Sequence, residues 1–272
     1  MKLSCLPVSL FQSFFDGSVN LPLWSEQAGQ LGLDCVDINI RCLKDLPVSA
    51  VEKMAETLPV PVLMVTTYSD FTNPDPVCRE QAVELAKHHI AMTAALKGRY
   101  LRLTAGQAYP GLSEGAVING VYDCFAACLP AAEEAGVRLL IENHSKPGAW
   151  QYDDFDFHLQ RMIRLWEKLR ELSIGVNYDT ANGFALQDWK QLLEVFRGRI
   201  ETVHVNDLVS VQPLKFCCVG DGIVPIGEQL AALYADGFRG EICIEEAGME
   251  GLAGIGRSVA HTKQLLQQLA TA

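Results

Sequence analysis

The chain has 272 residues, 49% of them hydrophobic, which is enough to bury a sizeable core. Its 22 basic and 33 acidic residues give a formal net charge of -11, without a cluster of Lys and Arg. This composition argues against a nucleic-acid partner, which would need such a cluster over its phosphates. No stretch approaches the roughly 18–20 continuous apolar residues of a membrane span, so we expect no membrane partner.

Short apolar runs alternate with longer amphipathic segments along the whole chain. The runs are rich in Val, Ile and Leu and mostly continuous, as in strands buried on both faces. We predict strands at residues 3–10, 35–40, 62–67, 100–104, 137–142, 174–179, 202–205 and 241–245. We predict helices at residues 23–31, 48–57, 76–96, 113–134, 154–172, 189–196, 227–234 and 253–269.

Local signals mark several helix ends. Ser113 and Asp188 suit the N-cap position, where a side-chain oxygen accepts a free backbone N–H. Gly32, Gly98 and Gly136 follow helical patterns, at positions where a left-handed residue is wanted. Eight strand–helix units without a linker predict an α/β protein, a single (β/α)8 TIM barrel over residues 1–272.

Four polar residues end four consecutive predicted strands. They are Glu142, Asp179, His204 and Glu245. Each alone could be a helix cap, an ion-pair partner or a satisfied core group. Because barrel strands end at one common rim, the four should meet there, and an unpaired buried charge is costly. Together they predict a shared cation.

Three carboxylates and an imidazole suit one divalent ion such as Mn²⁺, Co²⁺, Mg²⁺ or Zn²⁺. An octahedral ion would keep two positions for adjacent substrate oxygens and polarise a carbonyl. Glu142 and Glu245, flanking the site, could then remove and return a proton on the neighbouring carbon. Glu246 competes with Glu245, but strand alternation points only one of them inward, and Glu245 follows the Ile-x-Ile run directly.

The nine cysteines are scattered and odd in number, without disulfide-framework spacing. This pattern is typical of a reduced, cytoplasmic protein. The sequence is compatible with a homo-oligomer and does not determine the oligomeric state. The stretch GLAGIGR at 251–257 fits either a phosphate-binding turn or ordinary turn glycines.

The strings IENH at 141–144, DTANGF at 179–184, HVND at 204–207, VGDGIVPI at 219–226 and IEEA at 244–247 resemble one family across the whole chain. This is the sugar isomerase/epimerase superfamily of xylose-isomerase-like TIM barrels. The resemblance implies that Glu142, Asp179, His204 and Glu245 bind the metal and that the two glutamates exchange the substrate proton.

The chain departs from the family pattern around this set. Many relatives carry Lys where this chain has Asn206, and ketose 3-epimerases commonly carry His where it has Asn182. These departures argue against a free-ketose 3-epimerase. The residues predicted to bind substrate are His144, Asn182, Asn206, Lys146 and Arg102; for Lys146 a solvated loop position, and for Arg102 a structural ion pair, are alternatives.

The predicted function is that of a metal-dependent isomerase or epimerase in carbohydrate metabolism, with manganese as the expected metal. It would act on a small sugar, sugar acid or keto-polyol through a metal-bound enediolate. A metal-dependent dehydratase of a keto-polyol such as an inosose is the second hypothesis, with His144 as the acid. An endonuclease-IV-like phosphodiesterase would need more His ligands than six histidines supply, four of them on predicted helices. A non-catalytic binding protein is the remaining alternative.

Overall fold

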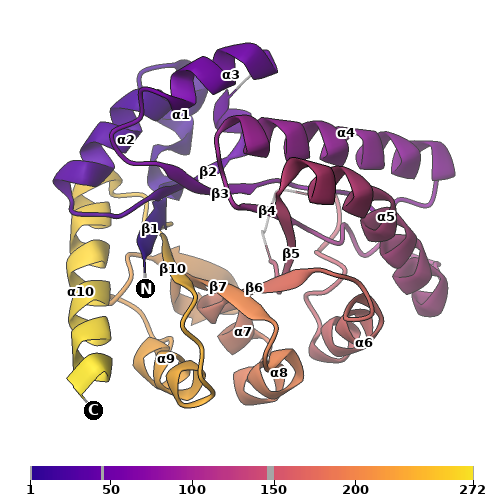
Figure 1. Cartoon of the computed structure of the whole chain (residues 1–272). Helices are drawn as coiled ribbons and strands as arrows, with labels where there is room; N and C mark the ends of the chain where they lie inside the picture. Colours follow the sequence, from indigo (N-terminus) through magenta and orange to yellow (C-terminus); the bar gives the residue numbers. More distant parts are fainter. Residues whose placement is uncertain (1, 44–45, 146–149, 272) are drawn as a thin grey trace.

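The computed structural model describes residues 2–43, 46–145 and 150–271. Eight parallel strands form a nearly closed barrel with helices around it, as Figure 1 shows, so the predicted TIM barrel is confirmed. Their order around the sheet is β1-β10-β7-β6-β5-β4-β3-β2. The strands are β1 (Leu3–Leu6), β2 (Val36–Asn39), β3 (Val62–Thr66), β4 (Tyr100–Leu103), β5 (Arg138–Glu142), β6 (Gly175–Asp179), β7 (Ile200–Val205) and β10 (Glu241–Glu245).

The seam between β1 and β2 is bridged at one end. The backbone N–H of Asp34 donates to the carbonyl of Leu3 at 2.9 Å, and the Asp34 carboxylate accepts the N–H of Leu3. Residues before β2 therefore tie the first and last strands of the sheet together.

Helices cover the outside of the barrel (Figure 1). They and the short 3-10 turns are η1 (Val8–Leu10), α1 (Phe11–Asp16), α2 (Leu21–Gln30), η2 (Ile40–Leu43), α3 (Val48–Ala55), α4 (Pro76–Ala95), α5 (Glu114–Ala135), α6 (Leu159–Leu169), α7 (Thr180–Ala185), α8 (Trp189–Phe196), α9 (Ile226–Ala235) and α10 (Gly251–Thr271). The apolar stripe of α6 is representative, since Met162, Leu165, Trp166 and Leu169 are all buried.

Within the described residues, α5 alone has the length and hydropathy of a membrane-crossing helix. Core helices of globular proteins pass the same test. Val121, Phe125 and Cys128 of α5 are buried in the barrel's hydrophobic core. The helix is therefore accounted for by its packing.

Most helix-end predictions hold. Asp188 caps α8 by accepting the N–H of Gln191 at 3.0 Å, and Gly136 ends α5 with a φ of 66°. Ser113 is the N-cap residue of α5, although its side chain makes no capping hydrogen bond. The prediction for Gly98 was wrong, because Lys97 takes the left-handed conformation with a φ of 58°.

Several other elements differ from prediction. The first strand ends at Leu6, because Pro7 lacks an N–H and the chain turns into η1 and α1. The helix predicted from residue 154 begins at Leu159, since Asp154 pairs instead with Gln107 in an isolated β-bridge. Sequence reasoning also missed an antiparallel hairpin, β8 (Asp207–Val211) with β9 (Leu214–Cys217), directly after β7.

Candidate metal centre

The four predicted ligands meet at the C-terminal rim of the barrel. Glu142, Asp179 and Glu245 end β5, β6 and β10, and His204 lies one residue before the end of β7. Strand register aligns them, since Asp179 pairs with His204 across β6 and β7. One ligand atom from each lies within 4.8 Å of those of the others. Glu245, and not Glu246, belongs to this group.

The arrangement has the character of a cation site. Among the described residues, both Glu142 oxygens and both His204 ring nitrogens are buried without a hydrogen-bond partner. His204 Nδ1 lies 3.2 Å from Glu142 Oε1 and 2.8 Å from Glu245 Oε2, close enough for ion pairing but poorly aligned for hydrogen bonds. Buried polar atoms in this condition call for an ion or a water. The donor set fits a divalent cation.

Arg102 neutralises one of the carboxylates. Its Nε lies 2.7 Å from Glu142 Oε2, and both side chains are buried. Burial acts to raise the pKa of Glu142, but Arg102 and His204 outweigh it and hold that pKa below its ordinary value. Arg102 also donates to the carbonyl of Thr67 at 3.1 Å. It therefore lies beside a candidate ligand, and its contact with substrate stays a prediction.

Asp179 is held by three asparagines. Its carboxylate accepts the backbone N–H of Asn182 at 2.7 Å and lies 3.5 Å from the Asn206 amide. The Asn143 side chain bonds both the N–H and the carbonyl of Asp179, each at 2.9 Å. Burial and the charges of Glu245 and Glu142 raise the pKa of Asp179 well above its usual range. The backbone of Asn182 and the side chain of Asn206 thus lie against a candidate ligand, and substrate binding by the two residues stays a prediction.

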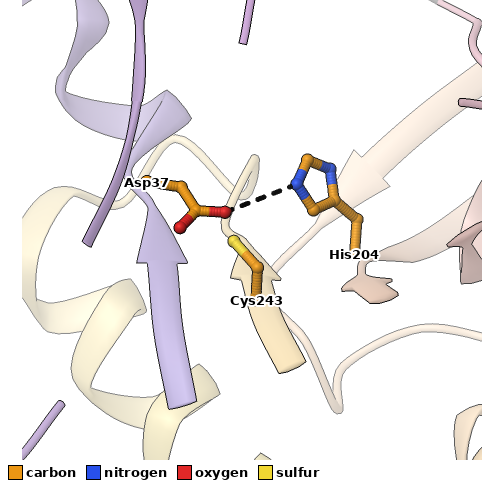
Figure 2. Close-up of side chains that lie close together, drawn as sticks. All are labelled: Asp37, His204 and Cys243. Atoms are coloured by element: carbon orange, nitrogen blue, oxygen red, sulfur yellow. Dashed lines mark ion pairs between the residues drawn. The ribbon is translucent and has the colours of Figure 1, made fainter. Parts of the chain in front are cut away.

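The far face of the His204 ring contacts a second group, which sequence reasoning missed (Figure 2). His204 Nε2 lies 3.8 Å from Asp37 Oδ2, and Cys243 lies beside both. Burial acts to lower the pKa of His204, but Cys243, Glu142 and Asp37 outweigh it and raise that pKa. A cation bound to His204 would compete with protons for the ring nitrogens.

His144 lies two residues beyond Glu142, in a buried dyad. Its Nδ1 is 2.6 Å from Asp154 Oδ1, and Trp150 Nε1 donates to the same oxygen at 2.9 Å. The Tyr68 ring packs edge-on against both the His144 and Trp150 rings. Lys146, the remaining predicted substrate-binding residue, lies outside the described residues.

Two further carboxylates near the rim have structural partners. Glu246 is fully buried and accepts the N–H of Gly248 at 2.8 Å. Asp207 accepts the backbone N–H groups of Gly220, Gly222 and Val224, and so shapes the loop after β9. This role of Asp207 could have been predicted from the HVND and VGDG strings, because a carboxylate and spaced glycines are typical of a loop whose backbone N–H groups converge on one acceptor.

The model of one protein family, the xylose isomerase-like TIM barrel, matches residues 25–266. The chain belongs to this family. Among solved structures, a D-tagatose 3-epimerase-like protein superposes with a TM-score of 0.78 at 15% identity, covering 100% of this chain and 99% of that one. At such identity the likeness shows the fold. A sequence comparison with curated proteins gave no match.

Two more solved structures bear on the chemistry considered above. The IolI protein with a binding zinc atom has a TM-score of 0.76 at 16% identity, covering 99% of this chain and 98% of that one. The probable 3-DHS dehydratase AsbF of Bacillus anthracis has a TM-score of 0.74 at 14% identity, covering 97% and 99%. Epimerase, metal-binding and dehydratase names thus all occur on this fold.

Proposed function

We propose that the protein is a metal-dependent isomerase or epimerase of a small sugar, sugar acid or keto-polyol. The observation that carries the proposal is the convergence of Glu142, Asp179, His204 and Glu245 within 4.8 Å, with buried atoms of Glu142 and His204 lacking partners. The names of the epimerases that share the fold support the substrate class. All nine cysteines are free thiols, in keeping with a cytoplasmic location.

Those four residues would hold one divalent cation, with Mn²⁺ the first choice. When bound, the cation would polarise the substrate carbonyl and stabilise negative charge developing on its oxygen. The protein's own task is proton transfer. Glu142 ends β5 and Glu245 ends β10, with β6 and β7 between them in the barrel wall, so they would approach the substrate from different sides.

The two glutamates differ in their surroundings. Glu142 is fully buried and paired with Arg102, which favours its ionised form and fixes its position. The Glu245 side chain is 14% exposed, so it borders the rim where substrate would enter. We assign proton removal and return to this pair, one carboxylate on each face of the reacting carbon.

The test is solvent deuterium exchange on a panel of ketoses, keto acids and inososes with the manganese-loaded protein. We expect deuterium to enter the carbon next to the carbonyl of a turned-over substrate, and Glu142→Gln and Glu245→Gln to abolish this entry. Metal content, measured on the same samples, separates lost ligation from lost proton transfer. Undiminished exchange and metal content in both variants would refute the proposal.

A dehydratase is the second candidate, and the His144–Asp154 dyad favours it. Asp154, 2.6 Å from Nδ1, orients the His144 ring, so that Nε2 could act toward a leaving hydroxyl. Product masses distinguish the two reactions, because dehydration removes one water and isomerisation does not. In a dehydratase, His144→Asn would abolish water loss yet keep deuterium exchange. In an isomerase it would leave the product mass unchanged.

A further inference from the structure

A second group of metal-type donors lies one layer deeper in the barrel than the rim site. Asp37 of β2, His204 of β7 and Cys243 of β10 each offer one donor atom, and these atoms lie within 4.8 Å of one another. Their side chains approach from three strands around a common point (Figure 2). Cys243 is in register with His204 on one neighbouring strand and with Ser4 on the other. The side chains of these three residues therefore lie on the same, inner face of the barrel wall. None is more than 1% exposed.

This inner group contains an unusual number of unsatisfied atoms. Both Asp37 oxygens, His204 Nε2 and the hydroxyl of Ser4 are buried without a hydrogen-bond partner among the described residues. A lone unpaired hydroxyl is common, but a carboxylate with neither oxygen bonded is costly deep in a core. Several such atoms around one point form a polar setting that suits an ion or an ordered water.

We infer that Asp37, His204 and Cys243 form a second metal site, selective for a thiophilic divalent cation such as Zn²⁺ or Cd²⁺. Mixed sulfur, nitrogen and oxygen donors favour such ions, whereas the rim site contains no sulfur. The 3.8 Å between His204 Nε2 and Asp37 Oδ2 is too long for a hydrogen bond. It suits two ligands of one ion, which at bond lengths of about 2 Å lie roughly 3–4 Å apart. Ser4, buried and in register with Cys243, would offer a hydroxyl oxygen to the same ion.

His204 links the two sites, because its two nitrogens face different groups. Nδ1 faces Glu142 and Glu245 at the rim, and Nε2 faces Asp37. A neutral imidazole has a lone pair on only one nitrogen. An ion in the inner group therefore leaves an N–H on Nδ1, directed at the rim carboxylates, and takes a ligand away from the rim. This inference concerns metal binding alone and does not depend on the proposed reaction.

Cadmium binding to the metal-free full-length protein tests the inference, because thiolate-to-cadmium absorption reports sulfur ligation directly. We expect one equivalent of Cd²⁺ to produce this ultraviolet band in the unmodified protein. Cys243→Ser should abolish the band. Asp179→Asn, which removes a rim ligand but none of the inner donors, should keep it.

Cys218→Ser is the matched control. Cys218 lies in the other described cysteine-containing group, with Asp221 and Glu250, where Arg257 already pairs with both acids. The band should survive this change, and its loss would overturn the inference. So would a band that persists in Cys243→Ser. If that variant does not fold, the ¹¹³Cd chemical shift of the unmodified protein decides, since a shift typical of oxygen and nitrogen ligands alone would refute the inner site.

Discussion

The two ends of the barrel use the same residue types in opposite ways. At the N-terminal ends of the strands, charged groups are paired with one another: Arg99 with Glu241 at 3.1 Å and Arg138 with Glu201 at 2.6 Å. At the C-terminal ends, the buried atoms of Glu142 and His204 lack hydrogen-bond partners among the described residues. At the N-terminal end each of these acids has an arginine of its own, whereas at the rim three carboxylates share one arginine and one imidazole, an excess of negative charge that suits a cation.

Shape alone does not make this distinction. A hollow of about 370 Å³ opens at the N-terminal end, lined by Arg99, Arg197, Glu201, Asp236 and Glu241 among others. Arg99 and Arg197 are already engaged there, with Glu241 and with Asp236. The chemistry points to the other end, where the donors converge.

The largest expected effect is on the rate of proton exchange, and it comes from comparing the same substitution at the two ends of one strand. Glu241 begins β10 and Glu245 ends it. Glu245→Gln should lower the rate of substrate proton exchange by about 10²–10⁴-fold, because a proton-transfer group is lost. Glu241→Gln, the same substitution at the other end, should leave the rate unchanged. Equal losses in the two variants would break the comparison.

Two arginines extend the comparison to stability. Arg102→Met leaves the carboxylate of Glu142 buried beside a neutral side chain, which should cost about 3–5 kcal/mol of unfolding free energy. Arg99 is 63% exposed, so Arg99→Met should cost less than about 1 kcal/mol. Urea denaturation of the metal-free proteins measures both. A similar cost for the two would mean that Arg102 does not neutralise Glu142 in the folded state.

The pH dependence of the metal-free protein tests the rim charges. The folded-state pKa of Asp179 is raised, so its ionised form destabilises the fold and stability should increase as pH falls through that pKa toward the ordinary pKa of the unfolded chain. The slope approaches about 1.4 kcal/mol per pH unit where the group titrates. The raised pKa of His204 acts with the same sign, because its stabilisation is lost as pH rises. Asp179→Asn should flatten the curve in denaturation experiments at several pH values and should also weaken metal binding.

A small effect on stability, and none on metal binding, is expected from a hydrogen bond at the N-terminal end. The Tyr100 hydroxyl donates to Glu241 Oε2 at 3.1 Å. Tyr100→Phe should cost about 1 kcal/mol, because Glu241 keeps Arg99 as a partner. Manganese affinity, measured by titration calorimetry, should not change. A marked loss of affinity would show that the two ends are coupled.

The sequence predicted the TIM barrel, which the structure confirms, and four polar residues that meet at its rim; their binding of a metal stays a prediction. β10 and α8 have the predicted bounds, and the four candidate ligands stand out because each is a polar residue that closes an apolar run. Their meeting follows from the barrel, in which strand ends share a rim. Glu245 was preferred to Glu246 because it follows the Ile-x-Ile run directly, and Glu245 is the one that lies near the other three residues.

What could not be predicted depends on pairing between distant strands. Asp37 lies inside an apolar strand. It comes close to His204 and Cys243 only because the barrel brings β2, at one end of the strand order, toward β10 and β7 near the other end. Arg102 reaches Glu142 because Arg102 is in register with Leu140, one inward position before the glutamate. A single strand contains no information about such registers. The β8–β9 hairpin was missed because its strands are only five and four residues long and lie directly after β7, in a stretch that resembles a loop.

Asn143 has a consequence for how this protein can change. Its side-chain amide bonds the backbone of Asp179 as a peptide group would, adding a rung to the ladder between β5 and β6 just beyond the end of β5. Two candidate ligands, Glu142 and Asp179, are thereby fixed to each other within the barrel wall. The loops that follow can then vary in length and sequence while the ligands stay in place, so substrate preference and metal retention can evolve independently.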